Sequence, residues 1–328
     1  MSSSSNTAGT EPLVDIESIR RAAEEIRGIA VRTPLVESPW PELWLKPETL
    51  QPVGAFKIRG AVTAVSRLDP ELRAKGILAH SSGNHAQAVA YAARRFGVDA
   101  HIVIPDNAPQ RKIDATRALG ATVELVPVEE RFSRPAELAA ETGKAMIPPF
   151  DHPDVIAGQG TIGLEIAEDA PDVDVVLVPV SGGGLISGIA AAIAALLPNA
   201  KVIGVEPALA GDAAESFRTG VHQKWAPQDT ARTIADGLRT FTVGELPWRH
   251  IQAQVSDIIT VTEEEIAEAT RRLMLQARLL AEPSGAVTTA AFLFHRDQLP
   301  PGRTVAVVSG GNIDPAVLRA ILDGPAHV

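Results

Sequence analysis

The chain has 328 residues, enough for one large domain or two ordinary ones, and 45% of them are hydrophobic. Its formal net charge of −10 at pH 7 argues against nucleic acid and anionic membranes as partners, because both are bound through basic patches. It has no cysteine, which excludes disulfides, cysteine–zinc sites and a cysteine nucleophile. We therefore expect a cytoplasmic protein that acts on a small molecule.

Helices and strands are predicted to alternate through the first half of the chain. Residues 1–14 begin with a serine-rich run and are predicted to form a disordered tail. Apolar periodicity then predicts helices at 16–26, 56–68, 84–96, 109–119 and 133–142. Short apolar runs predict strands at 44–46, 77–80, 100–104 and 122–126. A proline-rich segment at 148–153 then interrupts the pattern.

The alternation continues after this break. Helices are predicted at 155–170, 185–197, 215–219, 263–280, 284–295 and 315–322. The valine-rich run 173–180 is typical of a buried parallel strand, and further strands are predicted at 202–205, 258–261 and 304–308. Thr262 and Glu265 match the N-cap and capping box of the helix that follows them, and residues 232–248 are predicted to be a loop.

Repeated strand-then-helix order predicts an α/β fold with mainly parallel sheets and helices on both faces. Breaks near Gly76 and Pro148 delimit a smaller unit at 77–147, and residues 15–76 together with 148–328 are predicted to form a larger domain around it. Ligands of such folds bind at the carboxyl ends of the strands. The loops that follow the predicted strands are therefore the places to look for chemistry.

Lys57 is the first candidate catalytic residue. It begins the helix predicted at 56–68, where the positive end of the helix dipole disfavours its ammonium form. Burial would lower its pKa further, and a neutral amine can form a Schiff base with a carbonyl cofactor. By position alone, a lysine at a helix start is more often a solvated surface residue.

Three serine- and glycine-rich loops follow predicted strands. Residues 181–184, Ser-Gly-Gly-Gly, lie between a strand and a helix, where backbone N–H groups can hold a phosphate. The spacing matches neither the dinucleotide fingerprint nor a P-loop. Residues 81–87 offer hydroxyls and an amide at another helix start, which suits a carboxylate, and 309–312 form the third loop. Each loop alone could be a plain turn or helix cap, but together with Lys57 they indicate a phosphate-bearing cofactor with a reactive carbonyl.

Two acidic residues follow the strand predicted at 202–205. Glu206 and Asp212 could bind a hard cation such as Mg²⁺ together with a backbone carbonyl between them. Solvated loop carboxylates are the alternative explanation for both residues.

These residues together resemble the serine/threonine dehydratase and serine racemase family, pyridoxal-phosphate (PLP) enzymes of the tryptophan-synthase-β fold, also called fold type II. The matching stretches are 54–61, 81–87, 157–161, 181–184, 235–237 and 309–312. The resemblance runs from about residue 15 to about residue 320, and it implies the two-domain α/β fold expected above. One departure is Ser181, since the family's phosphate loop usually begins with glycine; a serine retains the backbone N–H and adds a hydroxyl.

The resemblance also implies roles for individual residues. Lys57 would form the Schiff base with PLP and act as the base at the substrate Cα. The other cofactor-binding residues would be Phe56, Asn84, Ser181, Gly182, Gly183, Gly184, Gly237 and Ser309, with Ser309 at the pyridine nitrogen. The substrate would contact Ser81, Ser82, Asn84, His85 and Gln87, and Ser82 matches the position that supplies an acid in racemases. A divalent cation would bind Glu206, the Ala210 carbonyl and Asp212.

The implied activity is elimination of water from L-threonine or L-serine, giving a 2-oxo acid and ammonia, in a homodimer. Serine racemase and threo-3-hydroxyaspartate dehydratase activities stay open as alternatives, because they need the same residues. Other classes of protein are a nucleotide-binding α/β enzyme, whose 181–184 loop would hold a nucleotide phosphate, and a non-catalytic cofactor-binding protein. Arg134 is a candidate neighbour of the substrate.

Overall fold

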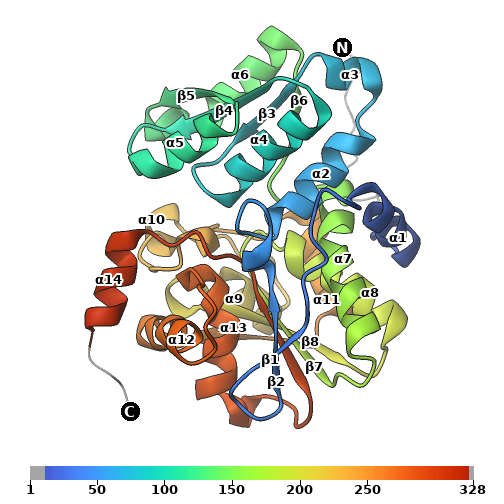
Figure 1. Cartoon of the computed structure of the whole chain (residues 1–328), viewed down its shortest axis with the longest axis vertical. Helices are drawn as coiled ribbons and strands as arrows, with labels where there is room; N and C mark the ends of the chain where they lie inside the picture. The colour runs from blue at the N-terminus through green and yellow to red at the C-terminus, as the bar shows by residue number, and fades with distance from the viewer. Residues whose placement is uncertain (1–11, 325–328) are drawn as a thin grey trace.

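The computed structural model describes residues 12–324, and its strands form two separate sheets (Figure 1). Of the tail predicted at 1–14, residues 1–11 lie outside the described residues, and residues 12–14 are described. Val14 is buried, and its N–H donates to His250 Nε2 at 3.1 Å. The packed part of the chain therefore begins before residue 15, because the apolar side chain of Val14 packs against helix α11 (Glu245–Gln254).

The larger sheet has six strands in the order β1-β2-β10-β7-β8-β9. All neighbouring pairs are parallel except β1 and β2. The strands are β1 (Val36–Glu37), β2 (Leu43–Pro47), β7 (Val175–Pro179), β8 (Lys201–Pro207), β9 (Asp257–Val261) and β10 (Thr304–Val308). β7 and β10 are buried along their whole length, as expected for apolar runs in the middle of a parallel sheet.

Helices cover both faces of this sheet. Alternate strand residues such as Leu177 and Ala306 pack with α12 (Glu263–Leu275) and α13 (Pro283–Phe294) on one face. Their neighbours Val176 and Val305 pack on the other face. The helices there are α7 (Pro153–Asp169), α8 (Gly184–Leu196), α9 (Asp212–Thr219) and α11. Helices α1 (Ile16–Glu25), α10 (Pro227–Thr230) and α14 (Pro315–Asp323) complete this part of the chain.

The smaller sheet has four parallel strands in the order β5-β4-β3-β6 and forms the upper part of the molecule in Figure 1. The strands are β3 (Ile77–His80), β4 (Ala100–Pro105), β5 (Thr122–Val126) and β6 (Ala145–Met146). The connecting helices are α4 (Asn84–Phe96), α5 (Gln110–Ala118) and α6 (Ser133–Thr142). Within the described residues, no helix is both long enough and apolar enough to cross a membrane.

Helix α2 (Lys57–Arg67) belongs to both halves of the molecule. Its residues Ile58, Val62 and Val65 share an apolar core with the smaller sheet and α4. Its other side contacts α7 so closely that a Cβ on Gly158 would lie 2.5 Å from the Arg59 carbonyl oxygen. The predicted domain boundary near Gly76 puts this helix, and α3 (Pro70–Ala74) after it, wholly in the large domain. The packing instead makes α2 a shared element.

A buried cluster of charges fixes the start of α2. Arg59 donates to Glu48 at 2.8 Å and to Glu165 at 2.6 Å, and Lys46 also donates to Glu165 at 2.6 Å. Desolvation of these charges is costly, but each one has an opposite charge in hydrogen-bond contact. The cluster therefore holds the first turn of α2, and with it Lys57, in a defined place.

Two of the predicted elements are wrong in part. The capping box of Thr262 and Glu265 is present, but α12 ends at Leu275 rather than at residue 280, because the backbone turns through a left-handed conformation at Arg278 (φ 58°). Residues 232–248 were predicted to be a loop, yet α11 begins at Glu245. Asp151, far away in the sequence, accepts hydrogen bonds from the N–H groups of Glu245 and Leu246 and so caps this helix from outside it.

Candidate active site

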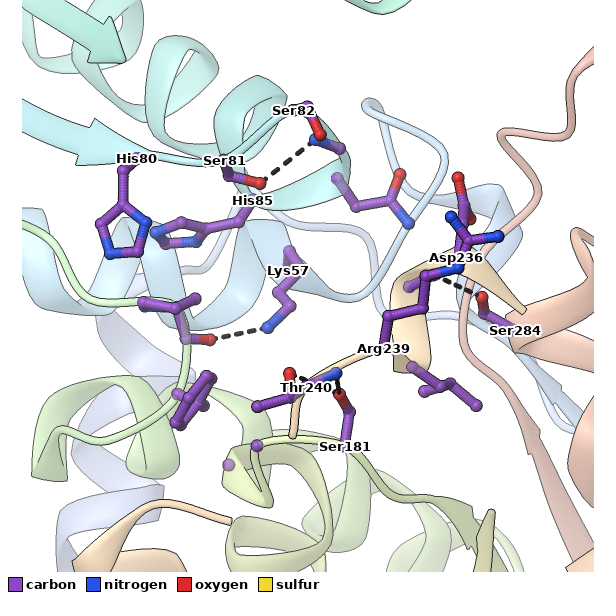
Figure 2. A pocket seen from close by; sticks show the side chains of 18 of the residues that line it. Lys57, His80, Ser81, Ser82, His85, Ser181, Asp236, Arg239, Thr240 and Ser284 are labelled. Carbon is purple, nitrogen blue, oxygen red and sulfur yellow. Dashed lines mark hydrogen bonds between the residues drawn. The ribbon is translucent and has the colours of Figure 1, made fainter. Parts of the chain in front are cut away.

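A cavity of about 870 Å³ lies between the two sheets, at the carboxyl ends of their strands. The loops after β3, β7 and β10 all line it, as the sequence predicts, and Lys57 lies among them (Figure 2). Every predicted cofactor-binding residue lines this cavity. Of the predicted substrate-binding residues, Gln87 does not line it, because it lies one turn into α4.

The Lys57 amine is held at the floor of the cavity. Its Nζ donates to the carbonyl oxygen of Pro149 at 2.6 Å and lies 5.1 Å from the centre of the Phe56 ring. Burial lowers the pKa of Lys57 from 10.5 to about 8. The backbone N–H of Phe56 donates to the Ser309 carbonyl at 3.0 Å, so the start of α2 is tied to the loop after β10. About one-tenth of this amine is therefore neutral and nucleophilic at pH 7, far more than for an ordinary lysine.

The glycines of the Ser181–Gly184 loop have no room for side chains. A Cβ on Gly182 would overlap the Phe150 ring. Gly183 has φ +88°, and a Cβ there would lie 2.7 Å from Pro247. Gly184 is the first residue of α8, so the positive end of a 13-residue helix faces the cavity. The Ser181 hydroxyl donates to Thr240 Oγ1 at 2.7 Å, which joins this loop to the segment before α11.

The Ser81–His85 loop leads into α4 from the other side of the cavity. Ser81 Oγ accepts a hydrogen bond from the Gly83 N–H at 3.1 Å, and Asn84 is the first helical residue. The His85 ring contacts the Ile147 carbonyl through Nε2 at 2.9 Å, and burial, then the nearby Lys57 charge, lower the pKa of His85 to about 3. Because a carbonyl only accepts, Nε2 carries the proton and Nδ1 is an acceptor. The backbone N–H of His85, rather than its ring, suits a carboxylate.

Residues from the larger domain close a third side of the cavity. Ser309 is buried and its hydroxyl donates to the Ser284 carbonyl at 3.5 Å, while the N–H of Gly237 donates to Ser284 Oγ at 2.9 Å. Glu282 also lines the cavity, and its carboxylate accepts from Asn84 Nδ2 at 2.6 Å. Glu282 is not among the residues that the sequence predicts for the site; its only signal is an acid directly before the proline that begins α13.

The basic residue near the serine loop was also missed. Arg131 lines the cavity and a smaller adjoining one of about 210 Å³, whose walls include His80, Ser81 and Ser82. The prediction that Arg134 neighbours the substrate is wrong, because Arg134 lines neither cavity. It instead donates hydrogen bonds to Glu124 at 2.6 Å and to Glu141 at 2.9 Å. The helical periodicity of α6 turns Arg134 toward these acids and away from the cavity.

Two aromatic rings meet across the cavity. Phe132, next to Arg131, makes an edge-to-face contact with Phe241 with ring centres 6.4 Å apart, and another with His80 at 5.6 Å. Phe132 belongs to the part of the chain that carries the smaller sheet, and Phe241 to the larger domain. The contact therefore links the two halves beside the cavity.

The predicted cation ligands lie outside this cavity, at the end of β8. Glu206 accepts from the N–H groups of Ala213 and Ala214, whereas neither carboxylate oxygen of the buried Asp212 has a hydrogen-bond partner in the described part of the chain. Burial and the neighbouring Asp212 raise the pKa of Glu206, and burial raises that of Asp212 to about 7. Residues 12–324 hold no group of three or more His, Cys, Asp or Glu side chains suited to a metal. A cation here would need backbone oxygens such as that of Ala210, as well as both carboxylates.

Comparison with known proteins decides the family. The model of the family "pyridoxal-phosphate dependent enzyme" matches residues 26–310. The chain belongs to this family. Among its relatives, L-threonine ammonia-lyase of Thermotoga maritima is 42% identical over 95% of this chain and 79% of its own. L-threo-3-hydroxyaspartate ammonia-lyase of Saccharomyces cerevisiae is 42% identical over 86% of each chain.

The solved structures give the same fold. Maize serine racemase superposes with a TM-score of 0.88 at 37% identity, over 95% of this chain and 97% of its own. The prediction of a fold type II PLP enzyme is thereby confirmed. The cavity fits PLP by its chemistry: Lys57 offers an amine with a lowered pKa to the aldehyde, and the Gly182–Gly184 cradle, which has no room for side chains, offers N–H groups to the phosphate.

Proposed function

We propose that this chain is a PLP-dependent ammonia-lyase that eliminates water from L-threonine or L-serine, giving a 2-oxo acid and ammonia. The observation that carries the proposal is the meeting, in one cavity, of Lys57, the Gly182–Gly184 cradle and the Ser81–Asn84 loop. They provide an amine, a phosphate site and a carboxylate site. The activity in the name of the Thermotoga maritima relative supports this choice of reaction.

Lys57 moves the proton in this scheme. When bound, PLP supplies an aldehyde for amines and a ring that accepts electron density from the substrate Cα. With its pKa near 8, Lys57 can take the Cα proton and later give it up at the working pH of a cell. Its hydrogen bond to the Pro149 carbonyl holds Nζ at one point of the cavity floor. Lys57→Ala should abolish activity, and an active variant would refute the scheme.

The loop and the helix start hold the substrate. The positive end of α4 faces the cavity at Asn84, and the hydroxyls of Ser81 and Ser82 lie beside it, which suits the α-carboxylate of an amino acid. On the other side of the cavity, Ser309 provides a neutral hydroxyl. The family resemblance implies that this hydroxyl would contact the pyridine nitrogen of PLP. An uncharged partner leaves that nitrogen unprotonated, so the ring withdraws less charge and prompt loss of the β-hydroxyl is favoured.

Arg131 favours a second candidate substrate, L-threo-3-hydroxyaspartate. Its guanidinium borders the serine loop and the adjoining small cavity, where it could pair with a second carboxylate. The relative from Saccharomyces cerevisiae is named for that substrate. Arg131→Gln should lower kcat/KM for hydroxyaspartate by more than about tenfold and change that for L-threonine much less, since a charged hydrogen bond contributes about 1.5–3 kcal/mol. Equal losses for both substrates would contradict a β-carboxylate site.

Product analysis tests the main proposal. The purified, PLP-loaded protein is offered L-serine, L-threonine and L-threo-3-hydroxyaspartate separately, and both 2-oxo acid and D-enantiomer are followed. Oxo acid from threonine or serine supports the ammonia-lyase and ranks its substrates. Mostly D-serine would refute it in favour of a racemase in which Ser82 is the second acid–base group.

Three finer points belong to the proposal. A divalent cation such as Mg²⁺ would bind Glu206, Asp212 and the Ala210 carbonyl. The support is that both buried Asp212 oxygens lack a hydrogen-bond partner in the part of the chain that the structure describes. The resemblance favours a homodimer, which light scattering on the purified protein would test. The lack of cysteine is compatible with a cytoplasmic location, which fractionation of the source cells would test.

A further inference from the structure

Three segments far apart in the sequence meet at the Asn84 side chain. Asn84 Nδ2 donates to Glu282 Oε1 at 2.6 Å, and Asn84 Oδ1 accepts from Asn312 Nδ2 at 2.8 Å. Asn84 and Glu282 line the cavity, whereas Asn312 does not. Asn84 follows a strand of the smaller sheet, and its two partners belong to the larger domain. These hydrogen bonds therefore cross from one half of the molecule to the other.

The partners fix which way the Asn84 amide faces. Asn312 Nδ2 also donates to the Val53 carbonyl at 2.8 Å, and a carbonyl can only accept, so the NH₂ side of Asn312 must point toward Val53 and Asn84. The oxygen of Asn84 then faces Asn312. Its NH₂ group faces Glu282, whose carboxylate accepts one of its two hydrogens. One N–H of a cavity-lining amide is left to donate to a ligand.

The Glu282 carboxylate has little freedom to move. It is 4% exposed, and a Cβ on Gly310 would overlap its Oε1. The N–H of Glu282 donates to the Gly310 carbonyl at 3.0 Å, and the Asn312 backbone contributes a further hydrogen bond. The neighbouring charges are Asp236 and Lys112, which form an ion pair with each other. A rigid, buried acceptor is what an amide needs to be held in one orientation.

We propose that Glu282 is a positioning residue that holds the Asn84 amide with an N–H donor directed at the bound cofactor. The inference rests on the proposed function, because it assumes that PLP occupies this cavity. The target of the donor is an electron-rich oxygen of the ligand, for which the ring hydroxyl is the candidate. Asn312 supports the same orientation from the other side of the amide.

A double-mutant cycle on cofactor affinity tests this role. The variants are Glu282→Leu, which puts an apolar side chain in its place and removes the acceptor, Asn84→Ala, and the two combined. PLP binding to the apoproteins is measured by quenching of tryptophan fluorescence. Glu282→Leu should weaken binding about tenfold, because the Asn84 donor loses its partner and can rotate away. In the Asn84→Ala background the same substitution should have almost no effect.

Two further variants separate positioning from general stability. Glu282→Gln keeps an acceptor oxygen and should restore most of the lost affinity. Glu268→Leu removes another buried carboxylate, which pairs with Arg271 on α12 outside the cavity, and should lower the melting temperature without weakening PLP binding. Equal losses from Glu282→Leu with and without Asn84 would overturn the proposal. Failure of the unaltered protein to bind PLP at all would instead refute the proposed function on which it rests.

Discussion

The lowered pKa of Lys57 makes a quantitative prediction about its reactivity. Burial is the only cause of the shift from 10.5 to about 8, with no neighbouring charge contributing. At pH 7 a lysine with a pKa of 8 is about one-tenth neutral, whereas one at 10.5 is neutral in only about one molecule in 3,000. The Lys57 amine should therefore react about 300 times faster with an electrophile at pH 7 than its ordinary pKa would allow, at equal access.

Competitive labelling measures this directly. The apoprotein is treated with a small amine-reactive acylating reagent between pH 6 and pH 10, and modification of each lysine is read by mass spectrometry. Labelling of Lys57 should rise tenfold from pH 6 to pH 7, reach half its maximum near pH 8 and level off above pH 9. Lys201, which is exposed at the start of β8, serves as the internal reference for reagent reactivity.

The shape of the curve decides the outcome. Lys57 labelling that still rises tenfold per pH unit between pH 9 and pH 10 would refute the argument, since burial would then not favour the neutral amine. Labelling in the presence of PLP provides a control for location, because the bound cofactor should protect Lys57 and leave Lys201 unchanged.

Three other predictions concern the phosphate cradle, the cation site and Glu282. Gly183 has φ +88°, so Gly183→Ala should weaken binding of PLP by at least about tenfold. Binding of pyridoxal, which lacks the phosphate, should stay nearly unchanged in competition titrations. Equal losses of affinity for PLP and pyridoxal would argue against a phosphate cradle. Saturating Mg²⁺ should raise the melting temperature by about 5 °C in the unaltered protein and not in Asp212→Asn; indifference to Mg²⁺ would argue against a cation site at Glu206 and Asp212. Burial, then Asp236, raise the pKa of Glu282 to about 7, against the opposing influence of Asn84, Lys112 and Asn312. The folded apoprotein thus retains a proton on Glu282 that the unfolded chain loses near pH 4.5. Its free energy of unfolding in urea, relative to that of Glu282→Gln, should therefore fall by about 2–3 kcal/mol from pH 5 to pH 8. A difference in unfolding free energy between the two proteins that stays constant over this range would contradict the raised pKa.

Local signals were sufficient for most of the fold. Short apolar runs located the strands of both sheets apart from the two-residue strands β1 and β6, whose few residues carry no pattern. They failed where a distant group decided the local structure. Asp151 caps α11 from about 95 residues away, and no residue within the predicted loop indicates that a helix begins there. The extent of α12 was misjudged for a related reason, because the turn at Arg278 is adopted by a residue with no turn preference.

The sequence by itself determined the class of chemistry. A lysine at a helix start and three Ser/Gly loops, each after a strand, can be read along the chain, and α/β folds bind their ligands at the carboxyl ends of the strands. Only the tertiary structure decided which side chains share the cavity. It brought Glu282 and Asn312 to Asn84, and it placed Arg131 rather than Arg134 at the cavity. It also left both Asp212 carboxylate oxygens buried with no hydrogen-bond partner among residues 12–324. The reason is physical: burial, desolvation and hydrogen-bond partners depend on contacts between residues that can lie 259 positions apart, which a local pattern cannot contain.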